Sequence, residues 1–163
     1  MNSNTSRGFN LVELVLTLVI LGVIAAIAIP KFFNQTTFEE RFFYDDVLAA
    51  SRYASKLALS SGCSVRMSIN AGGYSLAQDS NCDFTSPNFS INVQRPNDDE
   101  DFSNTDVPSG LTITASQTTL VFRPDHLVVN GSGSSFSTAT IQLAGEINRL
   151  ITIYEDSGHA VGI

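Results

Sequence analysis

Residues 7–30 read RGFNLVELVLTLVILGVIAAIAIP, and this stretch decides how the rest of the chain is interpreted. Between Phe9 and Ile29 the only charged residue is Glu13. As a helix this run would rise about 31 Å, which is the thickness of a bilayer's hydrocarbon core. A buried helix of a soluble domain would show a polar face, and none follows Glu13 apart from Thr17. The run therefore predicts a single membrane-spanning segment.

The composition of the whole chain agrees with this division. The 163 residues carry a net charge of -7, with 43% hydrophobic and only 15% charged residues. That length suits one domain with a real core, and the low charged fraction comes from the apolar run. The nine Lys and Arg residues are scattered, whereas a protein that neutralises phosphates clusters them. We therefore expect no nucleic-acid partner.

An ordinary secretory signal is a competing interpretation of the apolar run. Ala26-Ile27-Ala28 has the small-x-small spacing of a cleavage site, which would give a mature terminus at Ile29. Against it, the leader Met1–Gly8 has Arg7 as its single positive side chain, and Glu13 stands at the start of the apolar run.

Glu13 is the most informative residue of the run. A carboxylate in hydrocarbon costs several kcal/mol unless it is paired, shallow or protonated. Glu13 lies four residues after Phe9. If the chain were cut between Gly8 and Phe9, the new ammonium group on Phe9 would lie at the depth of Glu13, in its own chain or in a neighbour. Opposite charges at that depth would offset each other's burial.

Residues 7–14, followed by the apolar run, resemble the class III signal of type IV pilins and type II secretion pseudopilins. This resemblance implies that a prepilin peptidase cuts after Gly8 and methylates the new terminal amine of Phe9. It implies that Glu13 helps to neutralise the terminal amine of an adjacent subunit during assembly. Gly22 and Pro30 match positions between which the helix of the family can loosen in a filament. The implied partners are other pilin subunits, the inner-membrane assembly platform and the membrane.

Residues 31–61 predict an amphipathic continuation of the helix. Pro30 is expected to kink it, and Ser60-Ser61-Gly62 supplies its end. A continuous helix from Phe9 to Ser61 would extend roughly 80 Å. Its apolar residues recur at spacings of three and four: Phe43, Val47, Ala50, Ala54 and Leu57. Charged residues are expected mostly away from that stripe: Glu39, Glu40, Asp45, Asp46, Arg52 and Lys56.

After Gly62 the pattern changes to short β-like runs separated by Gly, Asn, Ser and Pro, which predicts an antiparallel sheet covering the helix stripe. The expected strands are Ser64–Ile69, Tyr74–Gln78, Phe89–Gln94, Leu111–Ala115, Thr119–Arg123, His126–Asn130, Thr138–Leu143 and Arg149–Glu155.

The turn Asn70-Ala71-Gly72-Gly73 also aligns the two cysteines. Pairing outward from Ala71 and Gly72 brings Cys63 opposite a position close to Cys82. A Cys63–Cys82 disulfide would stabilise the fold by about 3 kcal/mol in the chain-entropy model, and it requires an export compartment. Two free buried thiols are the alternative. Metal binding is disfavoured because no close His or Cys completes a ligand set.

Asn97-Asp98-Asp99-Glu100-Asp101 is the single run of charge. It is typical of a solvated loop, with calcium binding as the alternative, although the EF-hand pattern is missing. No catalytic motif is present, and His126 and His159 are isolated, so we expect neither an enzyme nor a cofactor.

The fold class expected is α+β and type IV pilin-like. Residues 1–8 would be the prepilin leader, 9–30 the transmembrane half of the helix, 31–61 its amphipathic half and 62–163 a β-rich periplasmic or extracellular head. The tail from Leu150 to Val161 resembles minor pilins and H/FimT-like pseudopilins, with most similarity to a minor subunit of the mannose-sensitive haemagglutinin (MSHA) pilus. That resemblance implies a single-pass inner-membrane protein that enters a pilus supporting adhesion, or a secretion pseudopilus. A tip adhesin with its own ligand site is a further alternative.

Overall fold

The computed structural model describes residues 10–32, 35–97 and 99–163, with the backbone alone for 26–32 and 35. The chain divides into two compact units, Met1–Gln35 and Thr36–Ile163. Each unit is described by itself.

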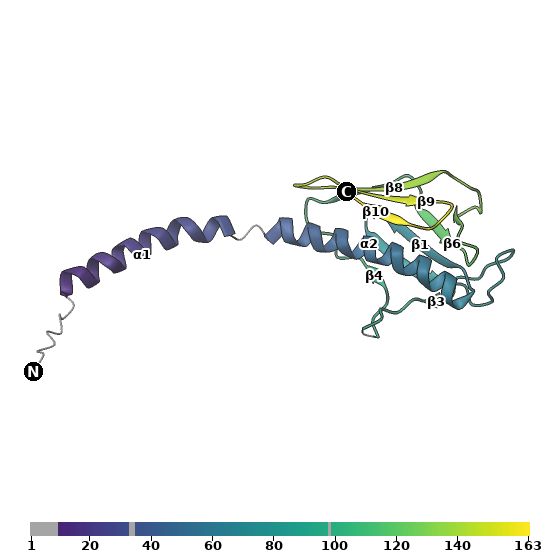
Figure 1. Cartoon of the computed structure of the whole chain (residues 1–163), viewed down its shortest axis with the longest axis horizontal. Helices are drawn as coiled ribbons and strands as arrows, with labels where there is room; N and C mark the ends of the chain where they lie inside the picture. The colour runs from purple at the N-terminus through teal and green to yellow at the C-terminus, as the bar shows by residue number, and fades with distance from the viewer. Residues whose placement is uncertain (1–9, 33–34, 98) are drawn as a thin grey trace, which may run out of the picture. The chain divides into compact units, whose positions relative to one another are not determined.

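The first unit contains helix α1, Leu11–Phe32 (Figure 1). Asn10 caps its N-terminus, because its side-chain oxygen accepts a hydrogen bond from the amide of Val12 at 3.3 Å. The large apolar side chains from Leu11 to Ile24 are each at least 50% exposed. Within the described residues, no helix is long and apolar enough to cross a membrane.

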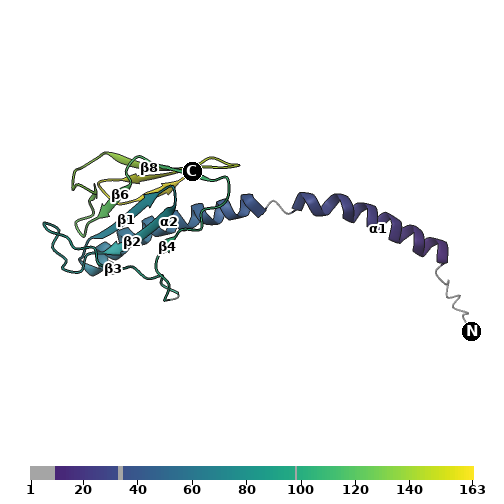
Figure 2. The same cartoon turned by 180° about the vertical axis from the view of Figure 1, so that it is seen from behind.

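Helix α2, Gln35–Ser61, packs against the sheets of the second unit (Figures 1 and 2). The predicted apolar stripe faces the core, although Leu57 at its end is only half-buried. Ala58, which was not predicted, also belongs to the stripe. Its fully buried members are Val47, Ala50, Ala54 and Ala58. The helix ends as expected, since Gly62 adopts a φ of 73° and its amide donates to the carbonyl of Ala58 at 3.1 Å.

The structure describes the helical part of the chain as two helices on either side of residues 33–34. Helix α1 runs through Pro30 to Phe32, and α2 begins at Gln35, with residues 33–34 outside the described part. A proline removes one amide donor, and the helix extends two residues beyond it here.

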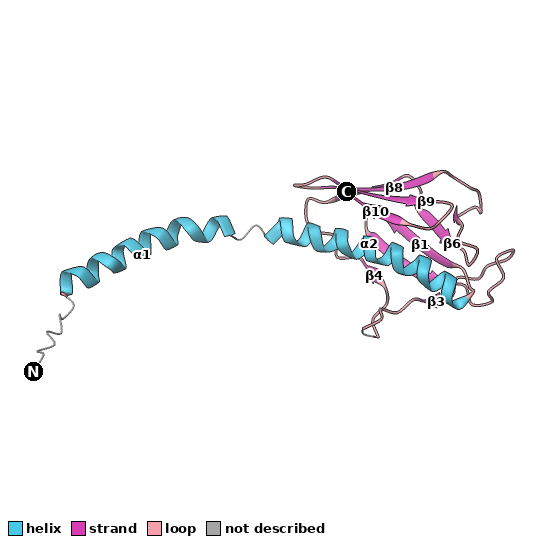
Figure 3. Ribbon diagram, viewed as in Figure 1, coloured by secondary structure: helices cyan, strands magenta, loops and turns pink. Residues whose placement is uncertain are grey.

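The larger sheet is antiparallel throughout its order β3-β2-β1-β6-β7, with β4 also paired to β2. Figure 3 shows the strands of the head in magenta. The turn at Ala71 and Gly72 joins β1 to β2 in the expected register, Asn70 opposite Gly73 and Val65 opposite Gln78. Its strands are β1 Val65–Asn70, β2 Gly73–Gln78, β3 Ile91–Asn92, β4 Ser103–Asn104, β6 Thr119–Phe122 and β7 Val128–Asn130.

The smaller sheet is also antiparallel and has the order β10-β9-β8-β5. Its strands are β5 Thr112–Ala115, β8 Thr138–Ala144, β9 Arg149–Tyr154 and β10 Ala160–Gly162. Alternate residues of both sheets join the helix stripe in one core, for example Met67 and Phe122 from the larger sheet and Ile141 and Ile153 from the smaller.

Two strands were missed in the sequence, and one was overextended. Strands β4 and β10 have two and three residues and contain Ser or Gly, so they carry no alternating apolar pattern. The strand expected at Phe89–Gln94 is reduced to β3, Ile91–Asn92. The other predicted strands lie within two residues of their observed ends.

Candidate functional site

The N-terminal assembly segment is described from Asn10 onward, so the expected cleavage site between Gly8 and Phe9 lies outside the described residues. Glu13 lies in the first turn of α1, at the third helical position after the Asn10 cap. A carboxylate there interacts favourably with the helix dipole and can complete a capping box. Glu13 therefore has a local helix-stabilising role available besides the assembly role implied by the resemblance.

The two other positions implied by the resemblance also lie in α1. Gly22 lies mid-helix, and a Cβ added to it would meet nothing within 4 Å. Pro30 lies in the last turn before Phe32. Thr17 donates its hydroxyl to the carbonyl of Leu14 at 2.8 Å, so it is satisfied within its own helix.

Cys63 and Cys82 form a disulfide, with their Cα atoms 4.4 Å apart. Cys63 follows the Gly62 cap of α2, and Cys82 lies in the segment after β2. The bond therefore ties the end of α2 to the loop of residues 79–90 that leaves the larger sheet. Among the described residues, no cysteine is free.

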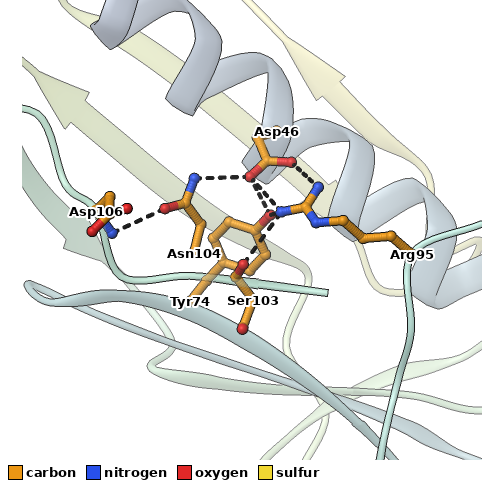
Figure 4. A network of polar contacts seen from close by, with 6 residues as sticks. All are labelled: Asp46, Tyr74, Arg95, Ser103, Asn104 and Asp106. Carbon is orange, nitrogen blue, oxygen red and sulfur yellow. Dashed lines mark hydrogen bonds and ion pairs between the residues drawn. The ribbon is translucent and has the colours of Figure 1, made fainter. Parts of the chain in front are cut away.

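A polar network centred on Asp46 joins α2 to distant parts of the head (Figure 4). Arg95 donates to both carboxylate oxygens of Asp46, at 2.7 and 3.1 Å. Tyr74 of β2 donates its hydroxyl to Asp46 at 2.6 Å, and the side-chain amide of Asn104 in β4 donates at 3.1 Å. Arg95 also lies 4.6 Å from the centre of the Phe102 ring. Three residues that lie 28 to 58 positions from Asp46 thus donate to its carboxylate.

The network shifts the acidity of its members. Burial raises the pKa of Asp46, but the hydrogen bonds from Arg95, Tyr74 and Asn104 and the guanidinium charge outweigh it, and the pKa is lowered. Burial, together with the hydrogen bond to Asp46, raises the pKa of Tyr74 above its usual range. The hydrogen bond to Asp46 also raises the pKa of Arg95 above its usual value. All three groups keep their ordinary charge across physiological pH.

This geometry suits a cross-link rather than a chemical site. Oδ2 of Asp46 accepts from Arg95, Tyr74 and Asn104, and Oδ1 accepts from Arg95, so the carboxylate is held by donors from the protein itself. The Asp46–Arg95 pair lines two neighbouring hollows, of about 700 Å³ and 420 Å³. Exposed Phe42 lines the larger one.

Glu40 forms a second cross-link that the sequence did not suggest. It was expected on the solvent side of α2, yet it is 5% exposed and both of its carboxylate oxygens accept from the amide of Glu146, at 3.0 and 3.2 Å. The carboxylate of Glu146 in turn accepts from the hydroxyls of Thr36 and Thr37. The connection between β8 and β9 is therefore fixed to the first turns of α2. Only the tertiary structure brings these groups together, because 106 residues separate Glu40 from Glu146.

The acidic run behaves as an exposed loop in its described part. Asp99 and Glu100 are exposed, and Asp101 accepts from the side-chain amide of Asn92 at 2.8 Å, while Asp98 lies outside the described residues. Across the described part of the chain, no group of three His, Cys, Asp or Glu side chains could hold a metal ion. His126 and His159 are exposed and lie on different turns.

The arrangement of the helix and the two sheets defines the fold class of the head. A helix stripe packed on antiparallel sheets is the pilin-like α+β fold. It is shared with a crystal structure of the type IV minor pilin FimU from Pseudomonas aeruginosa, with a TM-score of 0.50, 13% identity and coverage of 76% of this chain and 91% of that one. A second crystal structure of the same protein has a TM-score of 0.48, 15% identity and coverage of 78% and 87%.

The family follows from the sequence of the head. The family described as type II transport protein GspH matches residues 45–156, and the chain belongs to it. No curated protein matches the chain. The chain is thus a minor pilin or pseudopilin of a type IV pilus or a type II secretion system, a structural protein rather than an enzyme. Its family implies assembly with other pseudopilins and a membrane or pilus location.

Proposed function

We propose that the chain is a minor subunit of a type IV pilus of the MSHA type. In this proposal a prepilin peptidase cuts it between Gly8 and Phe9 and methylates Phe9. The apolar helix then holds it in the inner membrane, with the head in the periplasm, until it enters or initiates a filament that supports adhesion. The observation that carries the proposal is α1, whose large apolar side chains from Leu11 to Ile24 are exposed and which has Glu13 in its first turn.

The exposed side chains of α1 favour an apolar partner. Apolar residues surround this helix on all sides, and such helices are stable where lipid or other helices cover them. Other subunits in a filament core would supply that cover. Gly22 leaves room for close helix approach, because a Cβ added there would meet nothing within this chain.

Glu13 would fix the position of each subunit relative to its neighbour in the filament. An ammonium group on Phe9 of a neighbouring subunit would pair with the Glu13 carboxylate in an apolar environment. Removing one partner of a buried ion pair costs about 3–5 kcal/mol, so subunits that lack this carboxylate should be poorly incorporated.

The experiment compares Glu13→Ala and Glu13→Gln, with Thr17→Ala as a matched control in the next turn of the same helix. Glutamine can replace glutamate in a capping box, so Glu13→Gln keeps the capping role and loses only the interaction of the carboxylate with the helix dipole, about 0.3–1 kcal/mol. We expect both Glu13 variants to be cleaved after Gly8 but depleted from filaments, with Thr17→Ala unaffected. N-terminal mass spectrometry and filament content provide the two measurements.

Two results would contradict the proposal. Normal filament content of Glu13→Gln would leave Glu13 with a local helix role only. A mature terminus at Ile29 would make the apolar run an ordinary secretory signal, and the assembly role would be lost with it.

A minor pseudopilin of a type II secretion system is the second candidate, and the description of the matching family favours it. A deletion strain distinguishes the two functions. Loss of surface filaments with normal export of secreted enzymes supports the pilus subunit, and the reverse result supports the pseudopilin.

A further inference from the structure

The head contains a pocket of about 280 Å³ on the face of the larger sheet that points away from α2. Val121 of β6 and Val129 of β7 are paired in register and line the pocket, whereas Phe122 and Val128 point into the core. Ser64, Arg123, the loop of residues 79–90 and the turn of residues 130–133 line the rest of it. We call this cavity the β6–β7 pocket.

Both of these segments are held by internal bonds. The buried carboxylate of Asp79 accepts from the amides of Asn81 and Asn88, at 3.3 and 2.8 Å, and the disulfide fixes the loop at Cys82. The side-chain oxygen of Asn130 accepts from the amides of Ser132 and Ser134, at 3.1 and 2.9 Å. A preformed pocket loses little conformational entropy when a ligand binds.

The walls of the pocket combine aromatic rings with a guanidinium group. The ring of Phe84, which is 60% exposed, lies 4.9 Å from the guanidinium of Arg123, and both residues line the pocket. One amino group of Arg123 pairs with Asp125 at 2.8 Å, while its buried Nε has no acceptor within the described residues. A second aromatic residue, Phe89, also lines the pocket.

A second cation lies beside the pocket. Arg66 of β1 is paired in register with Val121, and its guanidinium lies 4.8 Å from the ring of Phe89. Arg66 forms no ion pair within the part of the chain that the structure describes, and its Nε is buried without an acceptor. Two arginines, Arg66 and Arg123, therefore lie at this face, where Asp125 pairs with Arg123 and the neighbouring loop carries Asp79 and Asp83.

We propose that the β6–β7 pocket binds a hexuronate residue, a sugar ring that carries a carboxylate. The apolar face of the ring would pack on Phe84 and Phe89, and the carboxylate would accept hydrogen bonds from Arg123. The hydroxyls of Thr85 and Ser132 line the same pocket and offer partners for the ring hydroxyls. A cavity near the lower end of the usual ligand-pocket range suits one ring rather than an oligosaccharide. This proposal is independent of how the subunit is assembled.

The test is ligand titration of the full-length chain in detergent micelles, followed by NMR of the amides of Gly131 and Gly133. Galacturonic acid, its uncharged methyl ester and acetate separate the contribution of the ring from that of the charge. We expect the acid to shift both amides, and each of the other two probes to bind roughly tenfold more weakly, because a charge-assisted hydrogen bond or the stacked ring is lost.

Two matched variants locate the site. Phe84→Ala should weaken galacturonate binding by roughly tenfold, whereas Phe42→Ala, which truncates another exposed phenylalanine on α2, should leave it unchanged. Arg123→Gln should abolish the preference for the acid over its ester. Absence of binding, equal binding of acid and ester, equal binding of acid and acetate, or displacement of the acid by a DNA oligonucleotide would each overturn the proposal.

Discussion

The Asp46 network allows a prediction of stability and of its pH dependence. In Asp46→Asn the donors from Arg95, Tyr74 and Asn104 lose a charged acceptor, and the new amide group points a donor at a guanidinium. Hydrogen bonds to charged groups contribute about 1.5–3 kcal/mol each, and loss of one member of a buried pair costs more. The Asp46 and Arg95 side chains are 19% and 25% exposed, so water offsets part of the loss. We expect a decrease of about 2–3 kcal/mol in the free energy of unfolding at pH 7.

The decrease should depend on pH in one direction. The pKa of Asp46 is lowered in the folded state, although burial alone would raise it, because the donors that surround it outweigh burial. A carboxyl group with a lowered folded pKa stabilises the protein above its unfolded pKa of about 3.9, and this contribution is lost as the pH falls through the folded pKa. The difference between the native chain and Asp46→Asn should therefore be constant above about pH 5 and shrink below about pH 4.

Urea unfolding of the full-length chain in detergent micelles measures both effects. The chain has no tryptophan and four tyrosines, so near-UV circular dichroism reports on tyrosine packing, including that of Tyr74. The control is Asp45→Asn, which changes the neighbouring carboxylate; that group is 57% exposed and lies 3.7 Å from Arg41. It should cost at most about 0.5 kcal/mol. Equal losses for the two variants, or a loss in Asp46→Asn that is as large at pH 3 as at pH 7, would refute the reasoning.

Three further predictions concern the head. Cys82→Ser should lower the free energy of unfolding by about 3 kcal/mol, because it removes a disulfide between residues 19 positions apart in the sequence. Unfolding with and without reductant checks this, and the stability of the variant should not change when reductant is added. Gly73→Ala should cost more than about 1 kcal/mol, since Gly73 has a φ of 117° and a Cβ would meet the backbone of Asn104; thermal unfolding against Gly110→Ala, which has open space, isolates the clash. Glu40→Gln should cost about 1–2 kcal/mol and raise hydrogen exchange at the Glu146 amide, and unchanged exchange there would count against the cross-link.

The sequence was sufficient to predict features that depend on residues a few positions apart. The helix stripe, the Gly62 cap and the turn at residues 70–73 depend on neighbours a few positions apart, and the structure has all three. The same turn sets the strand register that brings Cys63 near Cys82. Local chemistry determines each of these features, so no knowledge of the tertiary fold was needed.

The sequence was insufficient where a role depends on a distant partner. Glu40 and Asp46 resemble other charged helix residues in the sequence, and only the fold brings an amide from the β8–β9 connection and a guanidinium from residue 95 against them. Strands β4 and β10 exist because longer strands offer them an edge. Arg66 and Arg123 lie 57 positions apart, and the pairing of Arg66 with Val121 places them near the same end of β6.

The Cys63–Cys82 bond also determines how the head responds to proteolysis. The turn at residues 70–72, whose three residues are all exposed, lies inside the ring that this bond closes. A single cut there leaves two fragments that remain covalently joined and paired as strands. Such a nicked chain runs as one band on a gel until the thiols are reduced, and its surface stays assembled. The disulfide therefore holds the two fragments together after a single proteolytic cut at this turn.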